Sequence, residues 1–595
     1  MPTTRITLAL NTNQSQKAPL LVSSSTPLDP TSNDSCRTLV IKAAQSKLRL
    51  KKASRVFVAG TGKELINEED WRRALKDDVL LLVSAGEEYI GLTKEEAKAS
   101  DDDPPDIASL RLGNPDCSIV NLANRALIDP LSITQLETTA QTLPGIIHAV
   151  AQPDLHPGTK FPIGAVFVSD GWIHPPLIGG DIGCGMAWYK TRLTPSHVEC
   201  EKGRKLAEKL RGVEGPWRTQ QNRLTWLTDS SKSDSPTIHS AGEEWDTSLG
   251  TIGAGNHFAE IQVVEEVLDG NWKSNSTLEP RQILKEGEVV LLVHSGSRGF
   301  GGDILKRYTS NDRTSMRSSE PAASAYLEEH DRACAWAARN RDLIALRFLA
   351  CIEPGQESWD LGINDSDSSA TVEDIQTAAR AVQSRKVVDI CHNNVEATSW
   401  PPSPPSPVAT TDTPQSPSPP ATRVFIHRKG AAPTHDLVQS SLSTPSQPQL
   451  LPILPLPGSR GTPTLILHPL HPPKTAHGLH NALSLAHGAG RALSRAKAFA
   501  SLPAKYNHKP DDLLRGDFVK INAKGNKSVA GAGGWKGEEV RGGVWVVCEE
   551  KALVWEEAVE AYKDVWDVGD DLVQAGVAER VGWCRGRVSY KVRKS

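Results

Sequence analysis

The chain has 595 residues, a formal net charge of −4 at pH 7 and nine cysteines. This near-neutral charge excludes a globally basic nucleic-acid-binding protein, so an RNA partner has to be met by a local basic site. The cysteines are too sparse for a secreted disulfide framework, and neither a signal peptide nor a membrane-length apolar run is found, so we expect a soluble protein of the cytoplasm or nucleus without a membrane partner.

The N-terminal part divides into three segments. Residues 1–35 are rich in Ser, Thr, Asn and Pro without apolar periodicity, which predicts a disordered tail. Residues 36–95 carry short apolar runs, whose order favours a small β-grasp module of the ubiquitin-like or doublecortin-like kind, a type that more often binds a protein partner than catalyses. The acidic, proline-containing segment 96–107 predicts a linker. The elements expected in the module are strands at 38–41, 56–58 and 79–83 and a helix at 68–75.

Residues 108–595 form the larger part, for which periodicity alone predicts a mixed α/β domain. The pattern predicts a helix over 133–143 and buried strands at 289–293 and 387–391. Two segments interrupt it: 400–422 is dominated by Pro, Ser and Thr, and 441–457 by Pro, Ser, Gln and Leu. Both predict disordered surface loops.

Side chains with metal-ligand chemistry stand in short glycine-rich or strand-like contexts. Glycines around Asp181 and Cys184 permit a tight backbone that brings a carboxylate and a thiolate to one point. His257 follows a glycine-rich run, while His294 and His392 each follow an apolar run. Together these groups suit a borderline divalent ion such as manganese, zinc or cobalt better than magnesium or calcium. Taken alone, the segment at Cys184 favours a buried structural cysteine.

Groups suited to binding phosphate and nucleotide accompany these ligands. Asn256 and Glu260 flank the glycine-rich run, and Arg298 places a cation close to a strand end. The sequence His-Gly-Ala-Gly-Arg resembles a phosphate loop opening a helix, with Arg491 one turn from His487. His487 there either acts as a nucleophile that forms a phosphoramidate or only caps the loop.

Eight motifs occur in one order along residues 108–595, and their joint set resembles the RtcB family of GTP-dependent RNA ligases. The resemblance implies an α+β core of packed mixed β-sheets flanked by helices, preceded here by the β-grasp module, which lies outside the resemblance. The motifs are Asp-Leu-His-Pro-Gly from Asp154, Asp-Ile-Gly-Cys-Gly-Met from Asp181, Gly-Asn-His-Phe from Gly255, His-Ser-Gly-Ser-Arg-Gly from His294, His-Arg-Lys-Gly-Ala from His427, Pro-Gly-Ser from Pro457, His-Gly-Ala-Gly-Arg from His487 and Ala-Tyr-Lys-Asp from Ala561.

The resemblance also implies an activity. Members of this family join RNA with a 2′,3′-cyclic phosphate or 3′-phosphate end to RNA with a 5′-hydroxyl end, in tRNA splicing or RNA repair. By this resemblance His487 attacks the α-phosphate of GTP, the histidine–GMP intermediate passes GMP to the RNA 3′-phosphate, and the 5′-hydroxyl then displaces GMP. The expected partners are two Mn²⁺ ions, GTP as co-substrate, tRNA halves or other cleaved RNA ends, an archease-type activator and an unidentified protein bound by the N-terminal module.

Roles carry over residue by residue from the family's motifs. The implied metal ligands are Asp181, Cys184, His257, His294 and His392, with Cys184 as a bridge. The implied catalytic residues are His487 as nucleophile and Arg298 and Arg491 as phosphate contacts. The implied nucleotide contacts are Asn256, Glu260, Ser459, Thr464, His487, Gly488, Ala489, Gly490 and Lys563.

Guanine specificity follows from the chemistry of one of these contacts. The Glu260 carboxylate can accept from the N1–H and 2-amino groups of guanine, which adenine does not present in that arrangement. The chain departs from the usual pattern at two places: Arg460 stands where members usually carry Met, and Thr464 where a serine is usual. Thr464 keeps the hydroxyl.

Two other functions remain open on the sequence. One is guanylylation-dependent capping or repair of 3′-phosphate ends without ligation, which the sequence does not separate from ligation. The other is a non-catalytic RNA-binding scaffold that acts through its N-terminal module, and the intact His487 and five intact ligands count against it.

Overall fold

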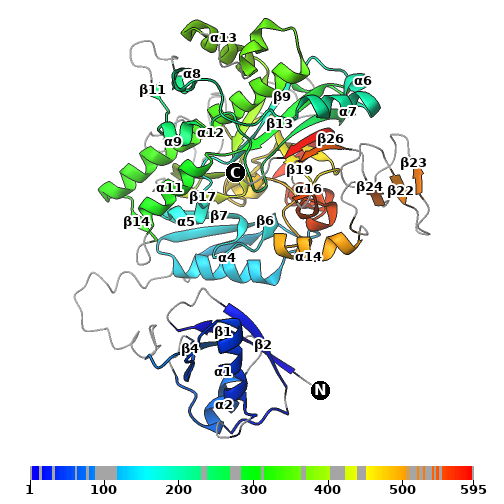
Figure 1. Cartoon of the computed structure of the whole chain (residues 1–595). Coiled ribbons are helices and arrows are strands. Elements are labelled where there is room, and N and C mark those ends of the chain that lie inside the picture. The colour runs from blue at the N-terminus through cyan, green and yellow to red at the C-terminus, as the bar shows by residue number, and fades with distance from the viewer. Residues whose placement is uncertain are drawn as a thin grey trace. The chain divides into compact units, whose positions relative to one another are not determined.

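Figure 1 shows the computed structural model of the chain, which divides into two compact units, Met1–Arg111 and Leu112–Ser595. No helix among the residues that the structure describes is long and apolar enough to cross a membrane. The predicted linker at 96–107 lies outside the described residues. The structure describes two stretches of the chain. The first is 3–87 except 12–16, 24, 30–31, 33, 60–62 and 76–78. The second is 117–591 except 230–236, 269–282, 310–313, 364–369, 403–421, 438–449, 506–507, 509–518, 522–526, 530–538, 542–543 and 549–552.

The N-terminal unit is a four-stranded mixed sheet with two helices. The sheet has the order β2-β1-β4-β3, in which β1 pairs parallel with β4 and the other two pairs are antiparallel. This order fits a β-grasp module, an assignment that stays a prediction. The elements are β1 (Thr3–Leu10), β2 (Lys17–Ser23), α1 (Cys36–Lys47), β3 (Arg55–Val58), α2 (Glu68–Ala74) and β4 (Val79–Ser84).

Two sequence predictions for this unit are wrong. Residues 3–23 hold two paired strands rather than part of a disordered tail, because Ile6 and Leu8 bury their side chains in the core of the unit. Residues 38–41 are helical rather than extended: the Ser35 hydroxyl accepts from the Thr38 N–H at the start of α1, and Val40 packs into the same core. The helix at 68–75 and the strands at 56–58 and 79–83 are confirmed as α2, β3 and β4.

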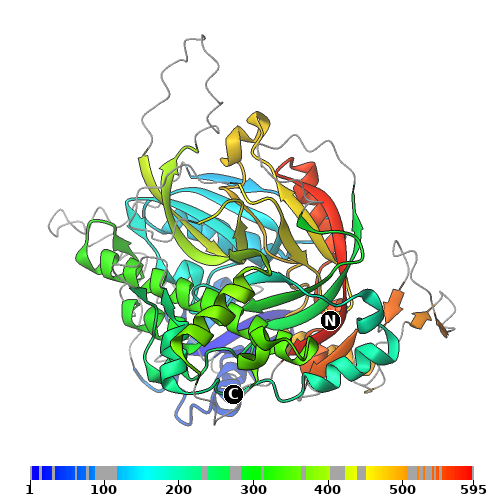
Figure 2. The same cartoon turned by 90° about the horizontal axis from the view of Figure 1, so that it is seen from above.

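The larger unit is built on two sheets, and its α+β class is confirmed. One has the order β15-β9-β13-β12-β26-β20-β19, with β25 paired to β26, and the other has the order β16-β17-β7-β6-β5. In Figure 2 the cyan strands β6 and β7 lie beside the yellow-green strands β16 and β17. The strands are β5 (Ser118–Asn121), β6 (Ile146–His156), β7 (Ile163–Asp170), β9 (Gly185–Lys190), β12 (Phe258–Val267), β13 (Val289–Ser295), β15 (Lys386–Cys391), β16 (Asn393–Trp400), β17 (Thr422–Lys429), β19 (Leu454–Pro457), β20 (Thr464–Pro469), β25 (Trp545–Cys548) and β26 (Ala578–Lys591).

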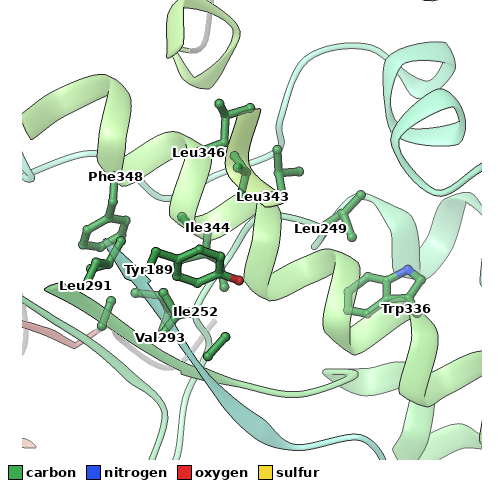
Figure 3. Packing of buried hydrophobic residues seen from close by; sticks show 14 of the residues in the cluster. Tyr189, Leu249, Ile252, Leu291, Val293, Trp336, Leu343, Ile344, Leu346 and Phe348 are labelled. Carbon is green, nitrogen blue, oxygen red and sulfur yellow. The ribbon is translucent and has the colours of Figure 1, made fainter. Parts of the chain in front are cut away.

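Helices cover these sheets, and the 32-residue helix α12 contributes most to the core. Figure 3 shows Tyr189, Leu291 and Val293 of the larger sheet packed against Ile344 and Phe348 of α12. Burial of such side chains stabilises the layer by about 1.5–3 kcal/mol each. The helices are α4 (Pro130–Thr142), α5 (Pro175–Ile178), α6 (Pro195–Val198), α7 (Cys200–Lys209), α8 (Gln220–Trp226), α9 (Glu243–Asp246), α11 (Gly299–Tyr308), α12 (Pro321–Ile352), α13 (Val372–Gln383), α14 (Arg495–Lys505), α15 (Leu553–Glu556) and α16 (Val565–Gln574).

The predicted helix over 133–143 and the strands at 289–293 and 387–391 are confirmed as α4, β13 and β15. Most of the predicted loop at 400–422, residues 403–421, lies outside the described residues. Its two end residues belong to strands: Trp400 ends β16, Thr422 begins β17, and the two pair with each other. The loop predicted at 441–457 extends too far. Its residues 441–449 are not described, but 454–457 form the buried strand β19. Proline is tolerated there because β19 is the edge strand of its sheet.

Candidate functional site

The predicted metal ligands come together at one end of the larger sheet. The Cys184 Sγ lies 3.3 Å from the Nε2 atoms of both His257 and His294, and the Asp181 Oδ2 lies 2.7 Å from the His257 Nε2. The ring of His392 stands edge-on to that of His294, with ring centroids 5.0 Å apart. One sulfur, one carboxylate and three imidazoles thus form a single cluster, which we call the ligand cluster.

Strand register explains this convergence. Because β9 pairs antiparallel with both β13 and β15, the first residue of β9, Gly185, lies opposite Ser295 and Cys391 at the ends of the other two strands. The first residue of β12, Phe258, lies opposite His294. Four strand ends therefore meet at one edge, and the residues just outside or at those ends are the ligands.

The ligand cluster has the donor set and protonation that a divalent cation requires. Burial, followed by nearby histidine charges, lowers the pKa of His294 and of His392 well below the usual range, so both rings are neutral. The His257 Nδ1–H donates to the Ile252 carbonyl at 3.0 Å, so Nε2 is the ring atom that faces the cluster and would bind a cation.

Several buried polar atoms of the same cluster are unpaired. The buried Asp181 Oδ1, His294 Nδ1 and His392 Nδ1 have no hydrogen-bond partner among the described residues. Burial alone would raise the pKa of Asp181, but the His257 ring outweighs it and the pKa is lowered. Cys184, His257 and His294 form the group that can hold a metal ion within the described part of the chain, and the residues present fit a soft or borderline cation.

His487 lies next to this cluster, with its ring centroid 4.6 Å from that of His392. Its Nδ1 lies 2.7 Å from the Oδ2 of Asp154, a fully buried carboxylate on β6. With Nδ1 donating to Asp154, the lone pair of the ring is on Nε2. The sequence motif contained Asp154, but its role in orienting His487 becomes visible only in the fold.

The loop that follows His487 is held by its own backbone. Gly490 has φ of +70°, and a β-carbon there would lie 2.2 Å from the Asp154 carbonyl oxygen, so only glycine fits. The Ala489 N–H donates to the Pro457 carbonyl at 2.9 Å. The loop does not open a helix as predicted, since α14 begins only at Arg495 and Arg491 forms a β-bridge with Tyr562.

A cavity of about 640 Å³ opens from His487 and the ligand cluster. Most of the predicted nucleotide contacts line it. These are Asn256, Glu260, Ser459, Thr464, His487, Gly488, Ala489 and Gly490, and the predicted phosphate contact Arg491 lines the cavity as well.

Inside this cavity Glu260 is fixed by a hydrogen-bond network. The Gln262 amide donates to Glu260 at 2.9 Å and to the Thr464 hydroxyl at 2.8 Å, and the Trp188 N–H holds the Gln262 oxygen at 3.0 Å. Burial raises the pKa of Glu260 from its usual value, while hydrogen bonds from Gln262 and Ser589 act in the opposite direction. The pocket thus presents an oriented carboxylate to a ligand.

Lys563 lies beside the strand that carries Asp154. Its ammonium group donates to the carbonyl oxygens of Pro153 at 3.0 Å and Leu155 at 2.6 Å, on either side of Asp154, and it is not among the residues that line the cavity. Burial lowers the pKa of Lys563 to about 8. Two of the three N–H groups of the ammonium thus hold the strand that carries Asp154, and its contact with a nucleotide stays a prediction.

The two predicted phosphate-contacting arginines lie in different surroundings. Arg491 donates to the carbonyls of Leu493 and Glu556 and to the Tyr562 hydroxyl, and it borders the cavity. Arg298 lies outside the cavity lining, packed on Gly253 and close enough to Asp181 for charge attraction. It is thus on the metal side of the site.

Several lining residues were not assigned to the site from sequence, among them Glu557, Tyr562 and Lys591. The Lys591 ammonium lies 2.9 Å from Glu557 and donates to the Gly255 carbonyl at 2.7 Å. Nothing in the sequence near Lys591 signals a site. It reaches the cavity because β26 pairs with β12 more than 300 residues earlier in the chain.

Comparison with known proteins gives one consistent family. The family profile described as tRNA-splicing ligase RtcB matches residues 135–235 and 215–530, so the N-terminal unit lies outside the match. The chain is 30% identical over 465 residues to the RNA-splicing ligase RtcB2 of Escherichia coli, covering 78% of this chain and 93% of that protein.

More distant relatives agree. The tRNA-splicing ligase RtcB of Methanococcus maripaludis is 27% identical over 487 residues, covering 74% of this chain and 87% of that protein. The RNA-splicing ligase RtcB homolog 1 of Entamoeba dispar is 25% identical over 505 residues, covering 76% of this chain and 80% of that protein.

Proposed function

The chain belongs to the RtcB family of tRNA-splicing ligases, and from this premise we propose that it joins RNA 2′,3′-cyclic phosphate or 3′-phosphate ends to 5′-hydroxyl ends through a histidine–GMP intermediate. The observation that carries this proposal is the His487–Asp154 pair, which borders both the ligand cluster and the cavity. An imidazole oriented by a buried carboxylate is an activated nucleophile.

The first step uses groups of this chain. Asp154 holds the Nδ1–H of His487, so that Nε2 attacks the α-phosphate of GTP and pyrophosphate leaves. The developing positive charge on the imidazole is stabilised by the Asp154 carboxylate at 2.7 Å. GMP then passes to the RNA 3′-phosphate, and the 5′-hydroxyl of the second RNA displaces it.

Asp181, Cys184, His257, His294 and His392 are the residues that would hold two Mn²⁺ ions. When bound, such ions supply positive charge that stabilises attacking and leaving oxygens. Arg298 adds a cation close enough to Asp181 for charge attraction. The neutral imidazoles of His294 and His392 keep their lone pairs available for ligation.

Glu260 supports GTP as the nucleotide. Its carboxylate accepts from the N1–H and 2-amino groups of guanine, and Gln262 fixes its position. Ser459 and Thr464 border the same part of the cavity. An RNA substrate follows from the family, with an archease-type activator and a protein partner of the N-terminal module as further proposed partners.

The experiment that tests the proposal is incubation of the full chain with α-labelled GTP and Mn²⁺, followed by denaturing electrophoresis. We expect label on the protein that acid removes and alkali does not, as for a phosphoramidate. Addition of RNA with a 3′-phosphate and RNA with a 5′-hydroxyl should then yield joined RNA. Capped but unjoined 3′ ends would favour end capping instead, and a protein that takes no label even with archease present would contradict the proposal.

Replacing Asp154 by Asn tests the orientation of the nucleophile. An amide of the same shape lacks the charge that fixes the ring and stabilises its cation, so we expect guanylylation to slow by about 100-fold or more while the fold persists. Single-turnover labelling rates measure this, with Asp170→Asn at the exposed end of β7 as the matched control. An unchanged rate in Asp154→Asn would remove Asp154 from the mechanism.

Arg460 is a departure from the family pattern that the structure places in the cavity. Its Nη1 is buried without a hydrogen-bond partner among the described residues, close enough to Glu260 and Glu557 for charge attraction. Loss of one charged hydrogen bond costs about 1.5 kcal/mol, so Arg460→Met should weaken GTP binding about tenfold. Calorimetric titration checks this against Arg204→Met on the exposed face of α7; equal affinities would show that Arg460 does not contact the nucleotide.

A further inference from the structure

Two cysteines lie side by side next to the ligand cluster. The Cys334 Sγ on α12 lies 4.0 Å from the Cys391 Sγ at the end of β15. Both side chains are partly exposed, and both line a second cavity of about 640 Å³. Both cysteines therefore border a cavity that a small oxidant dissolved in water can enter.

A metal site is the alternative for these sulfurs, because His330 lies one turn before Cys334 with its Nε2 3.7 Å from the sulfur. The same Nε2 accepts the Val395 N–H at 2.9 Å, and Nδ1 lies 2.9 Å from the Asp331 carboxylate. Both ring nitrogens are thus engaged. Within the described part of the chain, no further side chains complete the four ligands that a structural site uses around these two sulfurs, so the geometry favours a dithiol.

We propose that Cys334 and Cys391 form an oxidation site that closes to a disulfide in the presence of hydrogen peroxide. One thiol attacks a peroxide oxygen, which gives a sulfenic acid and one water. The second thiol attacks the sulfenic sulfur, the S–S bond forms and a second water leaves. The two cysteines lose two hydrogens and two electrons, and the peroxide is reduced to two waters.

The disulfide would act on the ligand cluster through the backbone. His392 directly follows Cys391, and its N–H donates to the Cys184 carbonyl at 2.8 Å. Gly183 packs so closely on α12 that a β-carbon there would lie 2.9 Å from the Cys334 Cα. An S–S bond of about 2.05 Å draws the two sulfurs together and pulls α12 and β15 against the Cys184 loop. This consequence rests on the proposed metal site.

The first test maps the bond itself. The folded chain is treated with hydrogen peroxide, alkylated without reduction, digested with trypsin and analysed by mass spectrometry. We expect a dithiothreitol-sensitive link between the peptides of residues 333–339 and 387–423. The link should persist in Cys351→Ser, a partly exposed cysteine of the same helix, and be absent in Cys334→Ser and Cys391→Ser. If the wild type yields only separately oxidised or alkylated peptides, the site does not exist.

The second test measures the coupling to metal. Mn²⁺ titration of reduced and peroxide-treated protein should show about a tenfold loss of affinity on oxidation, as for other disturbed outer-shell partners. The Cys334→Ser variant, treated in the same way, controls for oxidation of Cys184. Its affinity for Mn²⁺ should fall by less than about twofold. Equal losses in both proteins would overturn the coupling. If even the reduced wild type binds no Mn²⁺, the proposed metal site fails, while peptide mapping still decides on the disulfide.

Discussion

Replacing His487 by Asn should reduce covalent guanylylation to background, a loss of at least about a thousandfold, because the side chain that we propose as the nucleophile is gone. The asparagine amide can still donate to Asp154, which keeps the buried carboxylate paired. The loop therefore stays in place, and the loss reports the missing nucleophile rather than a broken fold. Labelling with α-labelled GTP measures the effect.

Two controls separate chemistry from binding in this variant. His487→Asn should bind GTP within a few-fold of the wild-type affinity, because Glu260 and its Gln262 partner are untouched. His197→Ala, which removes an exposed ring at α6, should label like the wild type. Persistent label in His487→Asn would mean that another residue carries the nucleotide.

The secondary structure was predictable from sequence where the apolar pattern of a segment matches the surroundings in which the segment packs. The run at 289–293 is buried on both faces, and its β-branched residues fit only a central strand. At 38–41 the same kind of run is helical, because the Ser35 cap and burial of Val40 outweigh β-propensity. Strand β19 was missed because its prolines argue against a strand unless the strand is known to lie at an edge.

The candidate site likewise contains residues that local motifs reveal and residues whose roles only the fold reveals. Asp181, Cys184 and His257 stand in short motifs whose chemistry is legible, and the strand register brings them together. Lys591 and the partner role of Asp154 depend on contacts between segments more than 300 residues apart, which no local pattern encodes. The contacts of Lys563 with the backbone on either side of Asp154 likewise join distant segments, although the residue itself stands in a short motif.

Replacing Cys184 by Ala should abolish Mn²⁺-dependent guanylylation through loss of metal. Its sulfur is the atom shared by His257 and His294, at 3.3 Å from each, so its removal takes the centre out of the ligand cluster. Metal content after dialysis, measured by mass spectrometry, should fall by at least about tenfold. Cys200→Ala, an exposed cysteine outside the cluster, is the matched control.

The pH dependence of metal binding gives the same residue a second signature. Burial, followed by the charge of Asp181, raises the pKa of Cys184 well above its usual value, so the thiol must release a proton when it binds a cation. Because one proton is released for each ion bound, the affinity for Mn²⁺ should rise about tenfold for each pH unit below that pKa. Cys184→Ala should lose this slope together with the affinity, because the lowered pKa values of His294 and His392 leave those rings already deprotonated. A wild-type affinity independent of pH would show that the thiol is not a ligand.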